Sequence, residues 1–206
     1  MRDLLCELLL ARSRKLKVSV SLLKMRDITG TEPFCSCFFE EFIMENLKIY
    51  EINSKYIDYL ALYAPHLFRN SQPNQQNTRK YIGVVLQIKN MNYFAPLSSF
   101  KAKHARMKEN IDFIKIKNYA VINLNNMFPV PPGECRYVNI SSIRDVNYKA
   151  LLLAEYRYIK SIQEKIRKNA HNLYKIKCKD ENGSALSKRC NDFILLEGAC
   201  ERYLRW

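Results

Sequence analysis

The chain has 206 residues, of which 48% are apolar and 26% charged, so it can bury a core and is not a disordered tail. It contains 34 Lys and Arg against 20 Asp and Glu, and a domain with this net charge of +14 most often binds a polyanion such as RNA or DNA. Five glycines, seven prolines and no apolar run of membrane-spanning length exclude collagen-like and transmembrane architectures.

The first 43 residues differ in charge from the rest of the chain. Residues 1–43 hold seven Lys/Arg and six Asp/Glu, whereas residues 44–206 hold 27 and 14, a charge of +13. Met44 begins a stretch typical of a protein start, and the preceding Glu-Glu pair would have purine-rich codons where a ribosome-binding site lies. We hypothesise that residues 1–43 are a disordered extension or lie outside the native protein, and that residues 44–206 form a single domain. The alternative is a genuine amphipathic leucine helix that packs on the body.

The leucine-rich start of the chain is only weakly similar to a signal peptide. Glu7 interrupts its apolar stretch, and no small-residue cleavage site follows. We therefore expect a cytoplasmic protein.

The regular pattern begins near Lys48. Ile49 and Ile52 bracket a short strand, and the run SKYIDYLALYA from Ser54 predicts a helix with Ser54 as its N-cap. The polar stretch 66–78 predicts a loop.

A β-hairpin and three further strands follow. β-Branched and aromatic residues predict strands at Tyr81–Ile88 and Tyr93–Leu97, joined by a turn over residues 89–92. The same signals, with prolines between the last two, predict three more strands, at Phe113–Ile116, Tyr119–Leu124 and Arg136–Ile140.

The last third of the chain is predicted to be helical. Apolar residues recur at three-to-four spacing from Asn147 to about Ile176, with no Pro or Gly, and a final helix is predicted from Ser187 to Leu204. The polar insert 180–184 separates the two. The fold class is therefore α+β: a small, strongly bent or barrel-like antiparallel sheet with helices packed against it.

Signatures of several common enzyme classes are absent. The chain has no P-loop, no G-x-G-x-x-G, no G-x-S-x-G, no H-E-x-x-H and no cluster of carboxylates. Its seven cysteines include no C-x-x-C, and no histidine lies at zinc-finger spacing, so we expect reduced thiols, no metal site and no cofactor.

The segment from Ala95 to His104 gathers groups that can act on a phosphodiester. It follows a predicted strand directly and holds Ser98, Ser99 and Lys101, with Lys103 beside them. Hydroxyls donate to phosphate oxygens, a lysine neutralises charge on a pentacovalent phosphorane, and a histidine moves a proton near neutral pH. The alternative is a solvated basic turn, because the pattern is generic.

The loop before the first hairpin strand supplies candidate RNA contacts. The amide of Asn77 can read a base edge, Arg79 can hold a phosphate or stack on a base, and Lys80 adds positive charge. An ordinary solvated loop is the alternative.

The start of the first predicted helix supplies two more candidates, Lys55 and Tyr56. Aromatic rings interleaved with basic side chains suit single-stranded RNA, whose bases stack on rings. The alternative is that the tyrosines form the edge of the core, and we favour it for Tyr59 and Tyr63.

Five stretches of the chain, in order, resemble the ToxN/AbiQ family of type III toxin–antitoxin endoribonucleases, and are most similar to its CptN-type branch. They are KIYEINSKYIDYL, NTRKYIGVVLQI, NYFAPLSSFKAKH, YAVINLNNMFPV and NDFILLEGACERYL. The resemblance covers about Lys48 to Leu204 and does not include residues 1–43.

The resemblance implies a metal-independent RNase with a fold similar to the Kid/MazF toxins, a compact twisted antiparallel sheet with packed helices. It implies sequence-preferring cleavage of cellular mRNA that leaves a 2′,3′-cyclic phosphate and a 5′-hydroxyl. It also implies a small pseudoknot antitoxin RNA, cut by the toxin from a repeated precursor, that inhibits the toxin in a closed protein–RNA assembly. The associated biology is abortive infection by phage.

The family's Leu-Thr/Ser-Ser-x-Lys turn matches Leu97, Ser98, Ser99 and Lys101, and the resemblance also reaches five other positions: Ser54-Lys55-Tyr56, Arg79 and His104. It implies that Lys101 stabilises the phosphorane while Ser98 and Ser99 fix the non-bridging oxygens. Arg79 and Lys55 would hold flanking phosphates, and Tyr56 would stack or orient the ribose. The acceptor of the 2′-proton stays open between His104 and a lysine. A tyrosine of some relatives is Gln75 here, which weakens any mechanism that needs it.

Two rival functions fit the same composition. A non-catalytic RNA-binding repressor would share the basic charge and the tyrosines, but would tolerate loss of the Ser-Ser-x-Lys turn with only a uniform drop in affinity. A MazF-like RNase toxin with a protein antitoxin would have an open reading frame upstream in place of tandem repeats.

Overall fold

The computed structural model describes residues 46–64, 67, 70, 78–180 and 183–205. The extension hypothesised for residues 1–43 lies outside these residues, as do Asn77 and most of the predicted loop 66–78. Within the described ranges, no helix is both long and apolar enough to cross a membrane.

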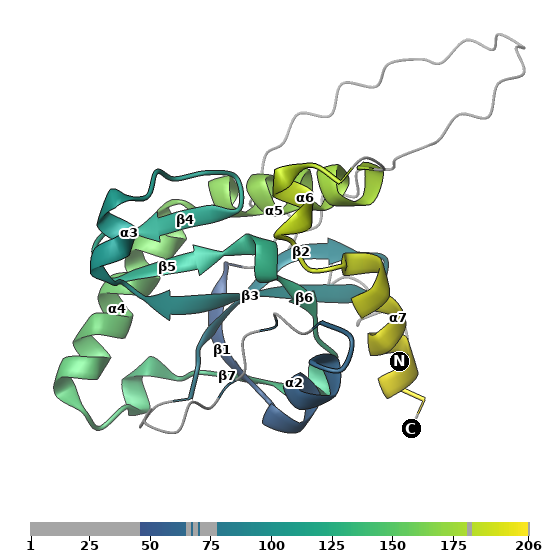
Figure 1. Ribbon diagram of the computed structural model, residues 1–206. Helices are drawn as coiled ribbons and strands as arrows, with labels where there is room; N and C mark the ends of the chain where they lie inside the picture. The colour runs from purple at the N-terminus through teal and green to yellow at the C-terminus, as the bar shows by residue number, and fades with distance from the viewer. Residues whose placement is uncertain (1–45, 65–66, 68–69, 71–77, 181–182, 206) are drawn as a thin grey trace, which may run out of the picture. The chain divides into compact units, whose positions relative to one another are not determined.

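Seven strands, all paired antiparallel, form one sheet in the part of the chain that the structure describes (Figure 1). They are β1 (Lys48–Ile52), β2 (Tyr81–Ile88), β3 (Met91–Ser99), β4 (Phe113–Ile116), β5 (Ala120–Asn123), β6 (Phe128–Pro129) and β7 (Cys135–Tyr137). The order across the sheet is β4-β5-β3-β2-β1-β7, and β6 pairs with β3. This confirms the predicted α+β class with an antiparallel sheet.

Strand β3 has partners along both of its edges. On one edge it pairs with β2, which places Pro96 opposite Tyr81. The other edge is shared: β6 pairs at Phe94, and β5 pairs from Leu97 to Ser99. The chain passes from β5 to β6 through the 3-10 turn η1 (Leu124–Asn126). The end of β3 is therefore enclosed by neighbouring strands.

Helices cover both faces of the sheet. Four buried residues of α4 (Val146–Ser161) and α5 (Gln163–Lys179) enter one core with Ala95 and Leu97: Leu152, Ile159, Ile166 and Leu173. Residues of α2 (Ser54–Leu60) and α7 (Phe193–Tyr203) enter a second core with Phe94: Tyr56, Leu60, Leu196 and Ala199. Because side chains alternate along a strand, β3 contributes to both cores.

A buried carboxylate ties two of these helices to β3. Glu197 on α7 accepts hydrogen bonds from the hydroxyls of Tyr93 on β3, at 2.5 Å, and Tyr174 on α5, at 2.7 Å. Burial and the contact with Glu197 raise the pKa of both tyrosines, so they remain donors at neutral pH.

The predicted helix over 147–176 is two helices, α4 and α5, that break at Ile162. Its φ of −116° and ψ of 15° leave the helical range, and its N–H is shared between the carbonyls of Tyr158 and Ile159. The break contains no Pro or Gly. Ile162 packs against the core where the chain changes direction, so packing and not a helix-breaking residue separates α4 from α5. The predicted final helix is likewise divided, into α6 (Ala185–Lys188) and α7.

Smaller differences arise from turn chemistry. Asn53, not Ser54, caps α2, because its side chain accepts a hydrogen bond from the N–H of Lys55 at 3.0 Å. The hairpin turn is shorter than predicted, since Lys89 adopts a left-handed conformation with φ of 52° and β3 starts at Met91. Besides η1 and β6, the structure adds three short elements that the sequence did not indicate: α3 (Ala102–Arg106), η2 (Pro132–Glu134) and η3 (Ile140–Ser142).

A buried acid on α4 makes stability depend on pH. Glu155 is 5% exposed, and burial raises its pKa to about 7. The folded state therefore holds this proton at a pH where the unfolded chain has lost it. The free energy of unfolding should fall as the pH rises from the ordinary carboxyl value through about 7, and stay low above it.

We expect Glu155→Gln to remove this dependence and to stabilise the protein above pH 7 by about 1–3 kcal/mol, because no charge is then buried. Urea denaturation at pH 5 and pH 8 measures it. The control is Glu201→Gln, on an exposed position of α7, which should keep the wild-type slope. A Glu155→Gln variant with the wild-type slope would contradict the assignment.

Candidate active site

The hydroxyl of Ser98, near the end of β3, is held by two neighbouring side chains. A guanidinium nitrogen of Arg79 donates to its Oγ at 3.1 Å, and Nδ2 of Asn123 on β5 donates at 3.3 Å. A serine hydroxyl has two acceptor lone pairs and one proton to donate. Because both lone pairs receive a hydrogen bond, the O–H of Ser98 is left to donate to a ligand.

Sequence reasoning missed Asn123. Only the register of the sheet reveals it, because Val121 lies opposite Ser98 and Asn123 follows two residues later on the same face. Nothing in the sequence distinguishes this asparagine from its neighbours Asn125 and Asn126.

The other residues of the predicted turn lie together at the end of β3. Ser99 pairs with Ala120 and is exposed, and Phe100 bonds its N–H to the carbonyl of Tyr119. Lys101 precedes α3, and Lys103 lies within it; both side chains are exposed and form no ion pair within the described ranges. The turn therefore presents two hydroxyls and two ammonium groups on one edge of the molecule.

His104 holds this turn in place. Its ring is buried, with its centre 5.7 Å from that of Phe100 and 5.8 Å from that of Phe113. Its Nδ1 accepts a hydrogen bond from the backbone N–H of Lys101 at 3.0 Å, and the backbone N–H of His104 donates to the carbonyl of Lys101 at 2.8 Å. A neutral imidazole has one acceptor nitrogen, which is used here. In this conformation His104 positions the backbone of Lys101, and its Nδ1 is not available to take up the 2′-proton. A proton-transfer role for its other ring nitrogen stays a prediction.

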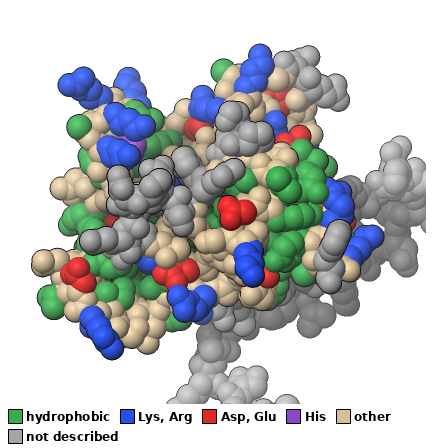
Figure 2. All heavy atoms as spheres, turned by 60° about the horizontal axis from the view of Figure 1, so that its bottom comes forward, with side chains coloured by type: hydrophobic (Ala, Val, Ile, Leu, Met, Phe, Trp, Pro, Cys, Tyr) green, Lys and Arg blue, Asp and Glu red, His purple; other side chains and the backbone are tan. Residues whose placement is uncertain are grey.

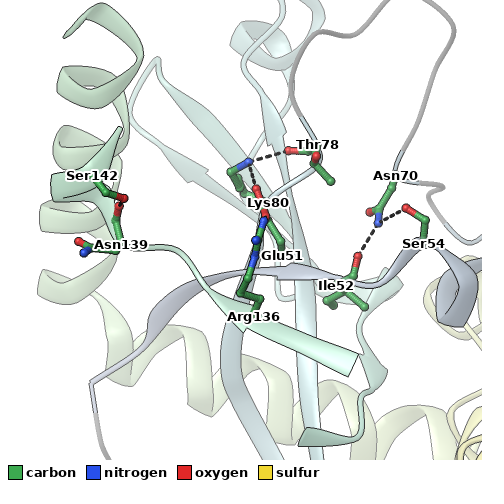
Figure 3. A network of polar contacts seen from close by, with 9 residues as sticks. All are labelled: Glu51, Ile52, Ser54, Asn70, Thr78, Lys80, Arg136, Asn139 and Ser142. Atoms are coloured by element: carbon green, nitrogen blue, oxygen red, sulfur yellow. Dashed lines mark hydrogen bonds and ion pairs between the residues drawn. The ribbon is translucent and has the colours of Figure 1, made fainter. Parts of the chain in front are cut away.

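The surroundings of Lys80 contradict the prediction that it contacts RNA. It is nearly buried, and its ammonium donates to Glu51 at 2.7 Å and to the carbonyl of Thr78 at 2.9 Å. Figure 3 shows Glu51 between Lys80 and Arg136, whose guanidinium lies 2.5 Å from the second carboxylate oxygen. Although burial opposes it, these hydrogen bonds lower the pKa of Glu51. The charge of Lys80 is therefore neutralised inside the fold.

The surroundings of Tyr56 contradict its predicted contact with RNA. The side chain has no exposed surface, its ring lies 4.8 Å from that of Tyr203, and its hydroxyl donates to the carbonyl of Pro129 at 2.8 Å. It cannot stack on a base in this conformation. Tyr59 and Tyr63 pack at the edge of the second core, as predicted.

Two further candidate RNA contacts, Lys55 and Arg79, lie at or near the surface. Lys55 is exposed at the start of α2, and among the described residues no contact joins it to Ser98 or Lys101. Arg79 is partly buried, and burial lowers its pKa, yet a guanidinium stays protonated at neutral pH.

A polar chain that the sequence did not indicate fixes α2 to the sheet. Asn70 donates to the carbonyl of Ile52 at 2.6 Å and to Ser54 at 3.2 Å (Figure 3), and accepts from the hydroxyl of Tyr81 at 2.7 Å. Tyr81 is two residues from Arg79, so this chain sets where β2 begins.

The face drawn in Figure 2 carries lysine and arginine side chains in separate groups, with apolar side chains between them. Such a surface can contact phosphates at several points along a strand. Within the described ranges, no group of three His, Cys, Asp or Glu side chains is arranged to hold a metal ion.

Comparisons with known proteins agree on one family. Residues 48–201 match the model described as toxin ToxN of type III toxin–antitoxin systems. The chain is 29% identical over 167 residues to the endoribonuclease ToxN of Bacillus thuringiensis subsp. kurstaki, covering 77% of this chain and 85% of that protein. It is 28% identical over 181 residues to the endoribonuclease AbiQ of Lactococcus lactis subsp. lactis, covering 82% and 95%.

The fold is similar to a solved type III toxin described as selectively inhibited by a non-coding RNA pseudoknot. The TM-score is 0.69 at 27% identity, over 79% of this chain and 100% of that chain. The similarity therefore extends over nearly all of the described sheet and helices.

His104 should titrate below its ordinary value of about 6.5. Burial lowers its pKa, and the positive charges of Lys103, Lys101 and Lys115 lower it further. Lys103→Gln removes one of these charges and should raise the pKa of His104. The matched control is Lys175→Gln, which should raise the pKa of His171 and leave His104 unchanged. Imidazole NMR titrations measure both; a His104 that titrates at or above 6.5 would contradict its buried, neutral placement.

Proposed function

This chain belongs to the ToxN family of toxins from type III toxin–antitoxin systems, and on that premise we propose that it is an endoribonuclease that cleaves RNA without a metal ion. The observation that carries the proposal is the hydroxyl of Ser98. Two hydrogen bonds, from Arg79 and Asn123, occupy its lone pairs and leave its proton to be donated. A donor held in this way suits a non-bridging phosphate oxygen.

The proposed reaction is attack by the ribose 2′-oxygen on the neighbouring phosphorus. The P–O5′ bond breaks, the 5′-oxygen takes up a proton, and the products carry a 2′,3′-cyclic phosphate and a 5′-hydroxyl. Negative charge grows on the non-bridging oxygens in the transition state. Preformed donors and a nearby cation lower the barrier to such a step by several kcal/mol.

The residues of the turn divide this work. Ser98 and Ser99 donate to the non-bridging oxygens, and the exposed ammonium of Lys101 neutralises the developing charge. Arg79 holds Ser98, and Lys103 and Lys55 contact flanking phosphates. The 2′-proton leaves to a base other than His104, because the acceptor nitrogen of His104 is bonded to Lys101.

The proposed inhibitor is a small antitoxin RNA. A solved relative is described as inhibited by an RNA pseudoknot, and this chain carries +14 net charge with which to bind one. We extend to this chain the processing of a repeated precursor, a closed protein–RNA assembly and a role in abortive infection. A preference for particular mRNA sequences belongs to the same proposal.

Lys101→Ala should lower RNA cleavage about 1,000-fold or more while RNA binding survives, because one lysine among many contributes little to affinity. The full chain, purified free of RNA, is incubated with total cellular RNA in EDTA, and the new ends are mapped. The matched control is Lys175→Ala, an exposed lysine on α5 that lies outside the Ser-Ser-x-Lys turn. Tight binding without cleavage by the wild-type protein would instead favour a non-catalytic repressor.

Ser98→Ala should lower the cleavage rate about 100- to 1,000-fold, the usual effect of losing one preformed donor to a developing oxyanion. Ser98→Thr keeps the hydroxyl and should retain most of the activity. Single-turnover rates on one RNA oligonucleotide compare them. Equal rates for Ala and Thr would show that Ser98 acts only through packing.

A further inference from the structure

A cavity of about 310 Å³ opens beside Asn123, the residue that donates to the hydroxyl of Ser98. It lies between the segment after α3, the adjoining ends of β4 and β5, η1, and the residue that follows α6. We name it the amide pocket. The lining residues that matter here are Asn110, Asp112, Phe113, Asn123, Asn125 and Arg189. Its volume is at the lower end of the range for small-ligand sites.

We propose that the amide pocket binds one nucleobase of the RNA strand next to the cleaved phosphodiester. The inference rests on the proposed function, and names a subsite of the same site. The pocket adjoins Ser98, because Asn123 lines the pocket and also donates to Oγ of Ser98 at 3.3 Å. A phosphate bound at Ser98 therefore lies one side chain from the pocket, within reach of the base of an adjoining nucleotide.

An arginine fixed by a carboxylate forms one wall. Nε of Arg189 donates to one oxygen of Asp112 at 2.5 Å and NH2 to the other at 3.1 Å, so the guanidinium plane is held at two points. The side chain of Asp112 is 6% exposed, whereas that of Arg189 is 46% exposed. A guanidinium whose charge is already paired is a poor phosphate clamp, but its flat face can stack on a base.

Apolar contacts suit a base equally well. Phe113 is the neighbour of Asn123 across β4 and β5, and Met107, which also lines the pocket, is 42% exposed. The exposed ammonium of Lys108 also lines the pocket, but the apolar wall beside a guanidinium plane fits a flat aromatic ring better than it fits a phosphate.

Three amides supply donors and acceptors for the edge of the base. Nδ2 of Asn123 is used by Ser98, and Nδ2 of Asn125 donates to the carbonyl of Arg189 at 3.0 Å, which leaves their carbonyl oxygens as acceptors. Oδ1 of Asn110 accepts from the N–H of Ile111 at 2.9 Å, which leaves its NH2 group as a donor. Watson–Crick edges present both donors and acceptors, so this set can read one.

Arg189→Lys is the most informative variant. Lysine keeps a positive charge to pair with Asp112 and removes only the planar guanidinium that would stack on a base. Asn110→Ala is the second, since it leaves the Arg189–Asp112 pair intact. Arg136→Lys is the control: it makes the same change in an arginine that pairs with Glu51, away from the pocket. The probe is a short RNA across a mapped cleavage site, with a series in which each nucleotide in turn is abasic.

In wild type, one abasic position beside the cut should slow cleavage roughly 5- to 150-fold, the value of one stacked base. Arg189→Lys and Asn110→Ala should slow cleavage of intact RNA, and cause no further loss on that one abasic RNA. Wild-type cleavage rates in both variants would overturn the proposal that the pocket binds a base. So would an equal loss on every RNA of the series, which is typical of a phosphate contact.

A wild-type protein that cuts no RNA would overturn the proposed function, and the pocket is then judged by binding alone. Affinities for poly(A), poly(U), poly(C) and poly(G) are compared between wild type and Arg189→Lys. Loss of affinity for at least one polymer but not all supports a base pocket. Equal affinities, or a uniform loss, overturn it.

Discussion

The pairing of β3 on both edges is the constraint on which the site depends. A strand with one partner could shift its last residues, but β2 with Lys80 on one side and β5 on the other fix the backbone from Leu97 to Ser99. This register brings Arg79 and Asn123 to Ser98 from opposite edges. The same strand enters both cores and donates Tyr93 to Glu197, so displacement of the site would disturb helix packing as well.

The net charge of the chain counts together basic side chains that pair with carboxylates and basic side chains that, among the described residues, are exposed without such a pair. Lys80, Arg136 and Arg189 pair with Glu51 or Asp112, and their charges are used within the fold. Lys101 and Lys103 stay exposed at the end of β3. Since a carboxylate partner competes with a phosphate for the same donors, the second group is better suited than the first to the proposed neutralisation of a phosphorane.

Sequence patterns predicted the elements whose signals are local. Strands β2 and β4 have the predicted bounds, because alternation and β-branching mark half-buried strands. The break at Ile162 and the cap by Asn53 were missed, since tertiary packing decides the first and side-chain geometry the second. At the site, one contiguous turn held Ser98, Ser99 and Lys101 together. Tyr56 and Lys80 were misassigned because burial cannot be read from residue type, and Asn123 was missed because it reaches Ser98 only through register.

The groups that surround Ser98 point to catalysis by placement. An amide and a guanidinium do not titrate near neutral pH, and His104 is buried with its acceptor nitrogen in use. What the fold supplies is therefore a set of donors whose directions are fixed before substrate arrives. Such donors stabilise charge without reorganising, and holding a 2′-oxygen in line with its own phosphorus removes a further entropic cost. On the proposed function, an antitoxin RNA would meet the same fixed donors as a substrate. Inhibition would then follow from occupancy of these donors, which requires no change in the shape of the toxin.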